Sequence, residues 1–229
     1  MNIIITGATG KIGSNLAKAL AKDHNLLLHY NKNNNYAQKL KDELGKYNNI
    51  VETISFNFNS SPDIFIDKCN SIFPCEGLIV CHSLYKTNNI NSFREKNFIE
   101  DININALSPL LLIKAFAKKK NSNFVINFLD SKGLSFDREH FTYSLSQELL
   151  AKIIKECAFN YAPIRVNGIA LGLNESDVSA SPINLPIKEK VTFEDITDTV
   201  CFLINSKHIT GDIIHLDSGR HVRNYSNHK

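Results

Sequence analysis

The chain of 229 residues is long enough for one sizeable core, since 43% of its residues are hydrophobic and 21% are charged. Its 26 basic and 23 acidic residues give a formal net charge of +3, too even a balance for a protein that coats nucleic acid, although it allows a local phosphate pocket. Its five cysteines include no C-x-x-C pair, the start MNIIIT is no signal peptide, and no apolar run approaches the ~18 residues of a membrane span, so we expect a soluble cytoplasmic protein without a metal or a membrane partner.

Seven short apolar runs alternate with longer segments of helical spacing. Runs that are apolar on both faces are typical of parallel strands covered by helices on each side. The runs occupy residues 2–6, 25–30, 51–58, 77–83, 123–130, 164–170 and 212–217. The alternation predicts a single α/β domain over 1–229, a doubly wound Rossmann-type fold with a mostly parallel seven-stranded sheet.

The first predicted strand runs into TGATGKIG, residues 6–13, which opens a helix. Gly7 permits the tight turn, Gly13 permits close helix packing, and the helix N-terminus offers free N–H groups to a pyrophosphate. We therefore expect a dinucleotide to be bound here, with Gly7, Thr9, Lys11, Ile12 and Gly13 as contacts. A glycine-rich turn without a ligand is the alternative.

The end of the second predicted strand should distinguish NAD from NADP. An acidic residue there would accept from the ribose 2′-OH, whereas a basic residue would pair with a 2′-phosphate. After Tyr30 the sequence supplies Lys32 and no acid, and Lys11 adds a second cation. These residues favour NADPH over NADH, although either lysine could be an ordinary solvated charge.

By these features the chain resembles the short-chain dehydrogenase/reductases over essentially its whole length, and within them the pteridine reductases and dihydromonapterin reductases. The stretches that carry the resemblance are TGATGKIG, LLLHYNK, NALSPLLLIKAFA, VINFLD, YSLSQ, IRVNGIALGL and ITGDIIHLDSGRHVR. A basic residue at Lys11, an aspartate at Asp130 and an aromatic ring at Tyr85, two residues beyond Ser83, resemble the pterin-reducing members in particular.

The resemblance implies further contacts with the cofactor and the substrate. It implies that Asn57, in place of the usual aspartate, binds adenine, and that Ser83 and Gly172 also contact the cofactor. It implies that Tyr85 and Leu173 contact the substrate, where an aromatic ring against a planar heterocycle contributes on the order of 1 kcal/mol beyond burial. Relatives commonly form tetramers through helices equivalent to 93–119 and 143–160, so the resemblance also implies a homo-oligomer, a tetramer or a dimer.

Several positions depart from the family pattern. Val80 and Cys81 replace two asparagines after the fourth strand, and His82 replaces a small residue. A structural role for His82, hydrogen-bonded to the backbone, is favoured over a role as proton donor. The loop at 174–186 is shorter than the helical lid usual in the family, so we expect an open or differently shaped substrate mouth.

The segment HFTYSLSQELL, residues 140–150, places Gln147 where the resemblance implies a lysine four residues after Tyr143. Gln147 can still hydrogen-bond the nicotinamide ribose, but a neutral amide cannot lower the pKa of the tyrosine. Tyr143 is then a poor base for oxidation. In a reduction the required form is the protonated phenol, so the loss of the cation weakens this acid without abolishing it. Asp130 would relay a proton or hold a guanidine-like edge of the substrate, unless it only caps the turn after its strand. Asn105 is expected to hold a helix kink and a water.

These residues support three functions. The first is an NADPH-dependent reductase that acts on a C=N or C=O bond of a small ring substrate such as a dihydropteridine. The second is a catalytically silent nucleotide-binding sensor or partner subunit that has lost the active lysine. The third, a sugar-nucleotide epimerase or dehydratase suggested by TGxxGxxG, is disfavoured because 229 residues leave no room for the substrate domain of such enzymes.

Overall fold

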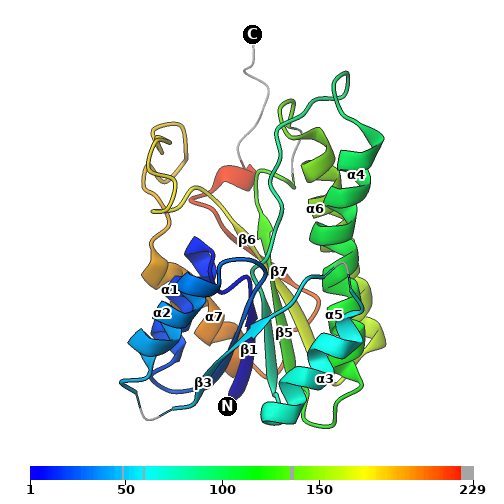
Figure 1. Ribbon diagram of the computed structural model, residues 1–229. Helices are drawn as coiled ribbons and strands as arrows, with labels where there is room; N and C mark the ends of the chain where they lie inside the picture. The colour runs from blue at the N-terminus through cyan, green and yellow to red at the C-terminus, as the bar shows by residue number, and fades with distance from the viewer. Residues whose placement is uncertain (48, 59, 135–136, 223–229) are drawn as a thin grey trace.

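Residues 1–47, 49–58, 60–134 and 137–222 are described by the computed structural model of the chain (Figure 1). In these residues a seven-stranded sheet has the strand order β3-β2-β1-β4-β5-β6-β7, and every neighbouring pair is parallel. The order reverses between β1 and β4, which is the switch point of a doubly wound sheet. The predicted α/β fold with a mostly parallel seven-stranded sheet is thus confirmed.

The seven strands fall within one residue of the predicted runs or inside them. They are β1 (Asn2–Thr6), β2 (Asn25–Tyr30), β3 (Val51–Ser55), β4 (Gly77–Val80), β5 (Phe124–Asp130), β6 (Arg165–Leu171) and β7 (Ile213–Leu216). β3 and β4 each end three residues earlier than predicted. Ser55 pairs with Tyr30 and Val80 pairs with Thr6, the last residues of the neighbouring strands β2 and β1, so the ladders on those sides go no further.

Helices cover both faces of the sheet, with α1, α2 and α7 on one side and α3, α5 and α6 on the other (Figure 1). The helices are α1 (Lys11–Leu20), α2 (Asn34–Leu44), α3 (Pro62–Ile72), α4 (Glu95–Ile102), α5 (Ser108–Ala117), α6 (Phe141–Asn160) and α7 (Phe193–Asn205). A π-helical turn, Asn103–Leu107, joins α4 to α5, and a short 3-10 turn, Arg220–Val222, follows β7. Among the described helices, none combines the length and apolar character needed to cross a membrane.

The core consists of two apolar layers, one on each face of the sheet. Successive residues of β1 divide between them: Ile4 packs with α3, α5 and α6, whereas Ile3 and Ile5 pack with α1, α2 and α7. This alternation is the period of two that strand geometry imposes. Because both faces are covered, the strands are apolar throughout, which is why the runs were visible in the sequence.

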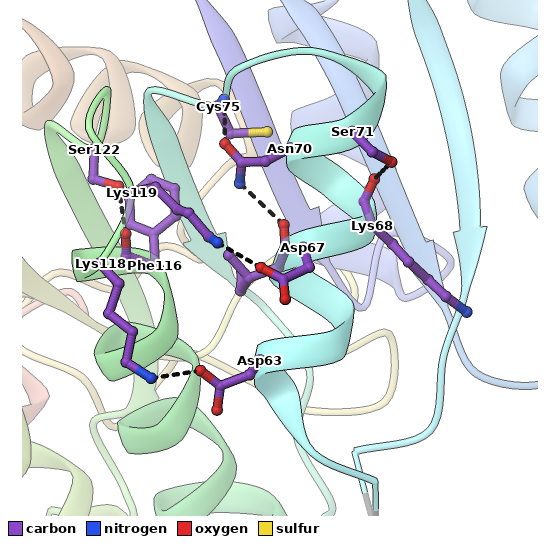
Figure 2. A network of polar contacts seen from close by, with 11 residues as sticks. Asp63, Asp67, Lys68, Asn70, Ser71, Cys75, Phe116, Lys118, Lys119 and Ser122 are labelled. Atoms are coloured by element: carbon purple, nitrogen blue, oxygen red, sulfur yellow. Dashed lines mark hydrogen bonds and ion pairs between the residues drawn. The ribbon is translucent and has the colours of Figure 1, made fainter.

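Ion pairs tie α3 to the end of α5 on the outside of one layer (Figure 2). Lys118 lies 2.7 Å from Asp63, and Lys119 pairs with Asp67. Solvent screens such exposed pairs strongly. The buried rings of Phe65 and Phe116 beneath them therefore account for most of the stability of this contact.

A buried histidine, His29, and a partly buried one, His82, support the turn that follows β1. Nδ1 of His29 accepts the backbone N–H of Gly7 at 3.1 Å, and its Nε2 lies 3.0 Å from the carbonyl oxygen of Phe56. His82 lies between two hydroxyl groups, with Nδ1 2.8 Å from Oγ1 of Thr6 and Nε2 2.7 Å from Oγ of Ser108. These two contacts are with side-chain hydroxyl groups and not with the backbone that we expected, so the structural role of His82 stays a prediction.

Both imidazoles are neutral in this setting. Burial lowers the pKa of His29 to about 4, although the Phe56 carbonyl opposes the change. Burial, and then the nearby His29, lowers the pKa of His82 to about 3. Protonation of Nδ1 in His29 would also break its bond to the N–H of Gly7.

The lowered pKa values predict a loss of stability in weak acid. Below the unfolded pKa of about 6.5 the unfolded chain binds protons that the folded chain excludes, so stability falls by roughly 1.4 kcal/mol per pH unit for each imidazole until the folded pKa is reached. Urea unfolding between pH 7 and pH 5 should show this slope. His82→Asn should remove about half of it, while His208→Asn, at an exposed position, should leave it unchanged. An equal slope in wild type and His82→Asn would contradict the assignment.

Candidate functional site

A cavity of about 520 Å³ opens at the carboxyl ends of β4, β5 and β6. Carboxyl ends of parallel strands meet at one edge, where α/β proteins bind their ligands. Eight of the predicted site residues line it: Ile12, Ser83, Tyr85, Asp130, Tyr143, Gln147, Gly172 and Leu173. Residues distant in the sequence are thus brought together as the fold class requires.

Tyr143 lies in the first turn of α6 and is only 6% exposed. Its neighbour Thr142 anchors this turn, because the N–H of Thr142 donates to Oδ1 of Asn88 at 3.0 Å and its hydroxyl donates to buried Asp101. The ring of Tyr85 meets the Tyr143 ring edge-on, with centroids 4.8 Å apart. The phenol is therefore held in one orientation beside the cavity.

The environment of Tyr143 keeps its phenol protonated. Burial raises the pKa of Tyr143 well above its ordinary value, and the charge of Asp130, a hydrogen bond to Asp130 and the nearby Tyr85 raise it further. A hydrogen bond with the Ser83 side chain lowers it, without reversing the direction. A protonated phenol is a proton donor and not a base.

Asp130 ends β5 and is subject to opposing influences. Burial is the largest influence and raises the pKa of its carboxyl group above the ordinary value, although the backbone N–H of Lys132, the charge of Arg220, the backbone N–H of Gly133 and the charge of Lys132 lower it in part. The N–H of Lys132 donates to Oδ1 of Asp130 at 2.7 Å. Asp130 therefore does cap the turn after its strand, as the alternative expectation had it, and it also faces the cavity.

Gln147 lies one turn further along α6 than Tyr143 and is 2% exposed. Its Oε1 accepts the backbone N–H of Asp130 at 3.0 Å. A Cβ placed on Gly133 would come within 2.6 Å of Cγ of Gln147, so the side chain packs tightly against this turn. The oxygen is therefore occupied by the protein, which leaves the Nε2 group as the donor for a ribose hydroxyl.

Asn105 lies in the π-helical turn between α4 and α5, at the predicted helix irregularity. Its Oδ1 accepts the N–H of Leu84 at 2.7 Å and the hydroxyl of Ser83 at 3.3 Å, while Nδ2 donates to the carbonyl of Leu84 and to Oγ of Ser146. The side chain thus joins the segment after β4 to α6. Every hydrogen-bonding group of the Asn105 side chain thus has a protein partner. The expected water would therefore have to bind the backbone of Asn105.

The glycine turn is close-packed against the end of β4. Gly7 has φ +63°, and a Cβ there would lie 2.8 Å from the backbone of His82. A Cβ on Gly13 would lie 2.5 Å from the carbonyl oxygen of Gly7. Gly10 begins α1 without a side-chain cap, so the first N–H groups of the helix, beside Thr9, are available to an anion.

The other predicted cofactor residues lie along the same edge of the sheet. Lys11 reaches across to the loop at 174–186, where its Nζ donates to the carbonyl of Ser176 at 2.8 Å. Tyr30 ends β2 and its hydroxyl donates to Asn34, while Lys32 and Asn57 are exposed beyond β2 and β3. No helix forms in the loop at 174–186, and its residues Asp177 and Ala180 reach the cavity, in line with the expected change in the mouth.

Sequence reasoning missed several residues of this site. His140 stacks on the ring of Tyr85, with centroids 4.4 Å apart, and Asp137 lies 3.0 Å from His140 and 2.8 Å from Nζ of Lys132. Arg220 lines the cavity from the turn after β7. These residues lie in loops and turns, where no hydrophobic periodicity of the sequence indicates which side chains face the cavity.

One group of residues near Arg220 has the composition of a metal site, although we predicted no metal. Ligand atoms of His215, Asp217 and His221 lie within 4.8 Å of one another among the described residues. The oxygens of Asp217, however, already accept the N–H groups of Gly219 and His221 and Nδ1 of His221. The carboxylate therefore organises the turn that carries Arg220.

Comparison with known proteins bears on the family and the fold of the chain. Residues 1–183 match the family model described as short chain dehydrogenase. The chain is 26% identical to the uncharacterized oxidoreductase YmfI of Bacillus subtilis, over 95% of this chain and 98% of that protein. It is also 26% identical to pteridine reductase 1 of Leishmania tarentolae, over 94% of each. The solved structure of FolM alternative dihydrofolate reductase 1 from Brucella canis, complexed with NADP, has a TM-score of 0.91 at 20% identity, over 99% of this chain and 96% of that chain, and so shares the fold.

The raised pKa values predict that Tyr85 and Tyr143 stay protonated in an alkaline titration up to pH 11. Burial raises the pKa of Tyr85 to about 12, and it also raises the pKa of Tyr143. Tyrosinate absorbance between pH 9 and pH 11 should therefore be the same in wild type, Tyr143→Phe and Tyr85→Phe, provided that circular dichroism shows a folded protein. Loss of a titrating phenol near pH 10 in Tyr143→Phe would refute the assignment.

Proposed function

The chain belongs to the short-chain dehydrogenase family, and on this premise we propose that it is an NADPH-dependent reductase of a C=N or C=O bond in a small ring substrate such as a dihydropteridine. The observation that carries the proposal is the position of a protonated phenol, Tyr143, beside the carboxyl group of Asp130 in one cavity. That pair is suited to deliver a proton as a hydride arrives.

The residues at the edge of the sheet fit a dinucleotide. The uncapped N-terminus of α1 offers N–H groups to a pyrophosphate, and Gly7 and Gly13 leave the space that such an approach needs. Lys11 and Lys32 favour a 2′-phosphate, and the similar FolM structure is complexed with NADP. When bound, the nicotinamide supplies the hydride.

The protein residues then have distinct tasks. Tyr143 donates its phenolic proton to the substrate, and Asp130, which is hydrogen-bonded to it, helps to return a proton from water. Gln147 holds the backbone of Asp130 in place and its Nε2 is directed to the ribose. Asn105 fixes the segment that carries Ser83, and Ser83 in turn contacts Tyr143.

The substrate contacts follow from the rings at the mouth of the cavity. His140 covers one face of Tyr85, so a planar heterocycle would stack on the other face. A charged Asp130 can accept two N–H groups from a guanidine-like edge. One similar protein is a pteridine reductase, which agrees with such a substrate.

We further propose that the protein is a cytoplasmic homo-oligomer, a tetramer or a dimer. Apolar side chains are exposed along the two long helical segments, at Ile99, Leu107, Leu145 and Leu149. Such a face is typical of an interface. All five cysteines are free, as in a reducing compartment.

A silent nucleotide-binding protein is the second candidate. The observation that favours it is Gln147, because a neutral amide stands where the family resemblance implies the lysine that activates the tyrosine. A protein of this kind would bind NADPH and leave dihydropterins unreduced.

Tyr143→Phe should test the proton donor. NADPH oxidation with a panel of dihydropterins should proceed in wild type, and the variant should lose about 100-fold or more in kcat because a positioned acid contributes that much. Tyr161→Phe, at the far end of the same helix, should keep the wild-type rate. An unchanged rate in Tyr143→Phe would remove this residue from the mechanism, and NADPH binding without turnover in wild type would favour the silent protein.

Gln147→Lys should separate an adapted site from a degraded one. We expect kcat/KM to fall by about tenfold or more, because lysine cannot accept the backbone N–H of Asp130 and an unpaired buried group costs about 1–3 kcal/mol. Gln147→Glu, which keeps an acceptor oxygen, is the matched control for this bond. A gain of activity in Gln147→Lys would show instead that the chain is a degraded enzyme.

A further inference from the structure

Arg220 lies in a turn whose backbone makes several hydrogen bonds to Asp217. Ser218 and Gly219 have φ of 55° and 80°, so the chain reverses sharply after β7. The buried carboxylate of Asp217 accepts the N–H groups of Gly219 at 3.1 Å and His221 at 2.9 Å, and the N–H of Arg220 donates to the Asp217 carbonyl at 3.0 Å. Arg220 is therefore flanked on both sides by residues bonded to one carboxylate.

Hydrogen bonds also join this turn to the segment at residues 187–189. The N–H of Ile187 donates to the carbonyl of Ser218 at 3.0 Å, and the hydroxyl of Ser218 donates to the carbonyl of Glu189 at 2.8 Å. Pro186 packs against Gly219, where a Cβ would meet it at 3.0 Å. The place of Arg220 at the cavity is thus set by the backbone.

Arg220 differs from the other cations near this cavity. Lys132 lies 2.8 Å from Asp137, and Lys11 donates to a backbone carbonyl. Arg220 makes no ion pair with any other residue that the structure describes. Its side chain is partly buried and lines the cavity together with Asp130 and Tyr143. A guanidinium keeps its charge at any working pH.

We propose that Arg220 is a positioning residue of this active site, which keeps the Asp130 side chain a charged carboxylate across the cavity so that it can accept N–H groups of the substrate and the Tyr143 hydroxyl. This inference rests on the proposed reductase function. The charged carboxylate in turn raises the pKa of Tyr143, so the cation preserves the phenol as an acid through Asp130.

The groups that share the cavity support this direction of influence. The titratable side chains that line it with Asp130 are Cys81, Tyr85, Lys132, Tyr143, Asp177 and Arg220. Only Lys132 and Arg220 among them are cations, and the charge of Arg220 lowers the pKa of Asp130 more than that of Lys132 does. Arg220 also lowers the pKa of Tyr85, which places its charge near the substrate face.

The test is the pH dependence of kcat/KM for NADPH and a dihydropterin between pH 4.5 and pH 9. Arg220→Met keeps the apolar stem and removes the charge, so the acid limb should move to higher pH by about one unit. Arg220→Lys should restore the limb to near its wild-type position. Arg138→Met, an exposed arginine outside this cavity, should leave the profile unchanged. A merely structural role would lower kcat/KM at every pH without moving the limb.

A second readout needs no turnover. The carbon-13 carboxyl resonance of Asp130 in the free protein should titrate about one unit higher in Arg220→Met than in wild type, with Asp130→Asn to assign it. An unmoved resonance would overturn the inference even if the enzyme is active. Failure of wild type to oxidise NADPH with any dihydropterin, with the resonance shifted, would instead count against the proposed function.

Discussion

The site depends on the hydrogen bond between the backbone N–H of Asp130 and the side-chain oxygen of Gln147. It joins the last residue of β5 to the helix that carries Tyr143, and it is partly buried, so breaking it would leave an unpaired donor beside the cavity. A lysine at this position could not make it. Gln147, which stands where the family resemblance implies a lysine, thus supplies a link between the end of β5 and the helix that carries Tyr143.

A second constraint acts where β1, β2 and β4 end. The contact of Gly7 with the backbone of His82 leaves no room for a side chain at position 7, and His29 takes up the N–H of that glycine. Neutral histidines provide acceptors and donors here without placing a positive charge in the core. The shape of the glycine turn therefore depends on imidazoles that must stay neutral. The proposed dinucleotide site and the stability of the fold in acid thus depend on the same two side chains.

The sequence was sufficient for the fold because covered parallel strands are apolar on both faces, as β1 and β6 illustrate. The sequence was also sufficient to predict that Asp130, Tyr143 and Gly172 lie close together, because parallel strands end at a common edge. It was insufficient for Arg220 and His140, whose direction is set by loop contacts such as the bonds to Asp217 and Asp137. Nor could the spacing reveal that Gln147 would bind the backbone of Asp130, since this depends on the close approach of Gly133.

The electrostatics of the cavity favour the protonated form of Tyr143. Oxidation of an alcohol requires the phenolate, and even an unperturbed tyrosine is only about one part in a thousand ionised at pH 7. Burial and the neighbouring carboxylate raise the pKa of Tyr143 further, so the phenolate is scarcer still. Reduction requires the phenol itself, which these same influences keep populated while making it a weaker acid. A cation on α6 would shift this balance toward the phenolate, whereas the charge of Arg220, in the turn after β7, acts on the pKa of Asp130.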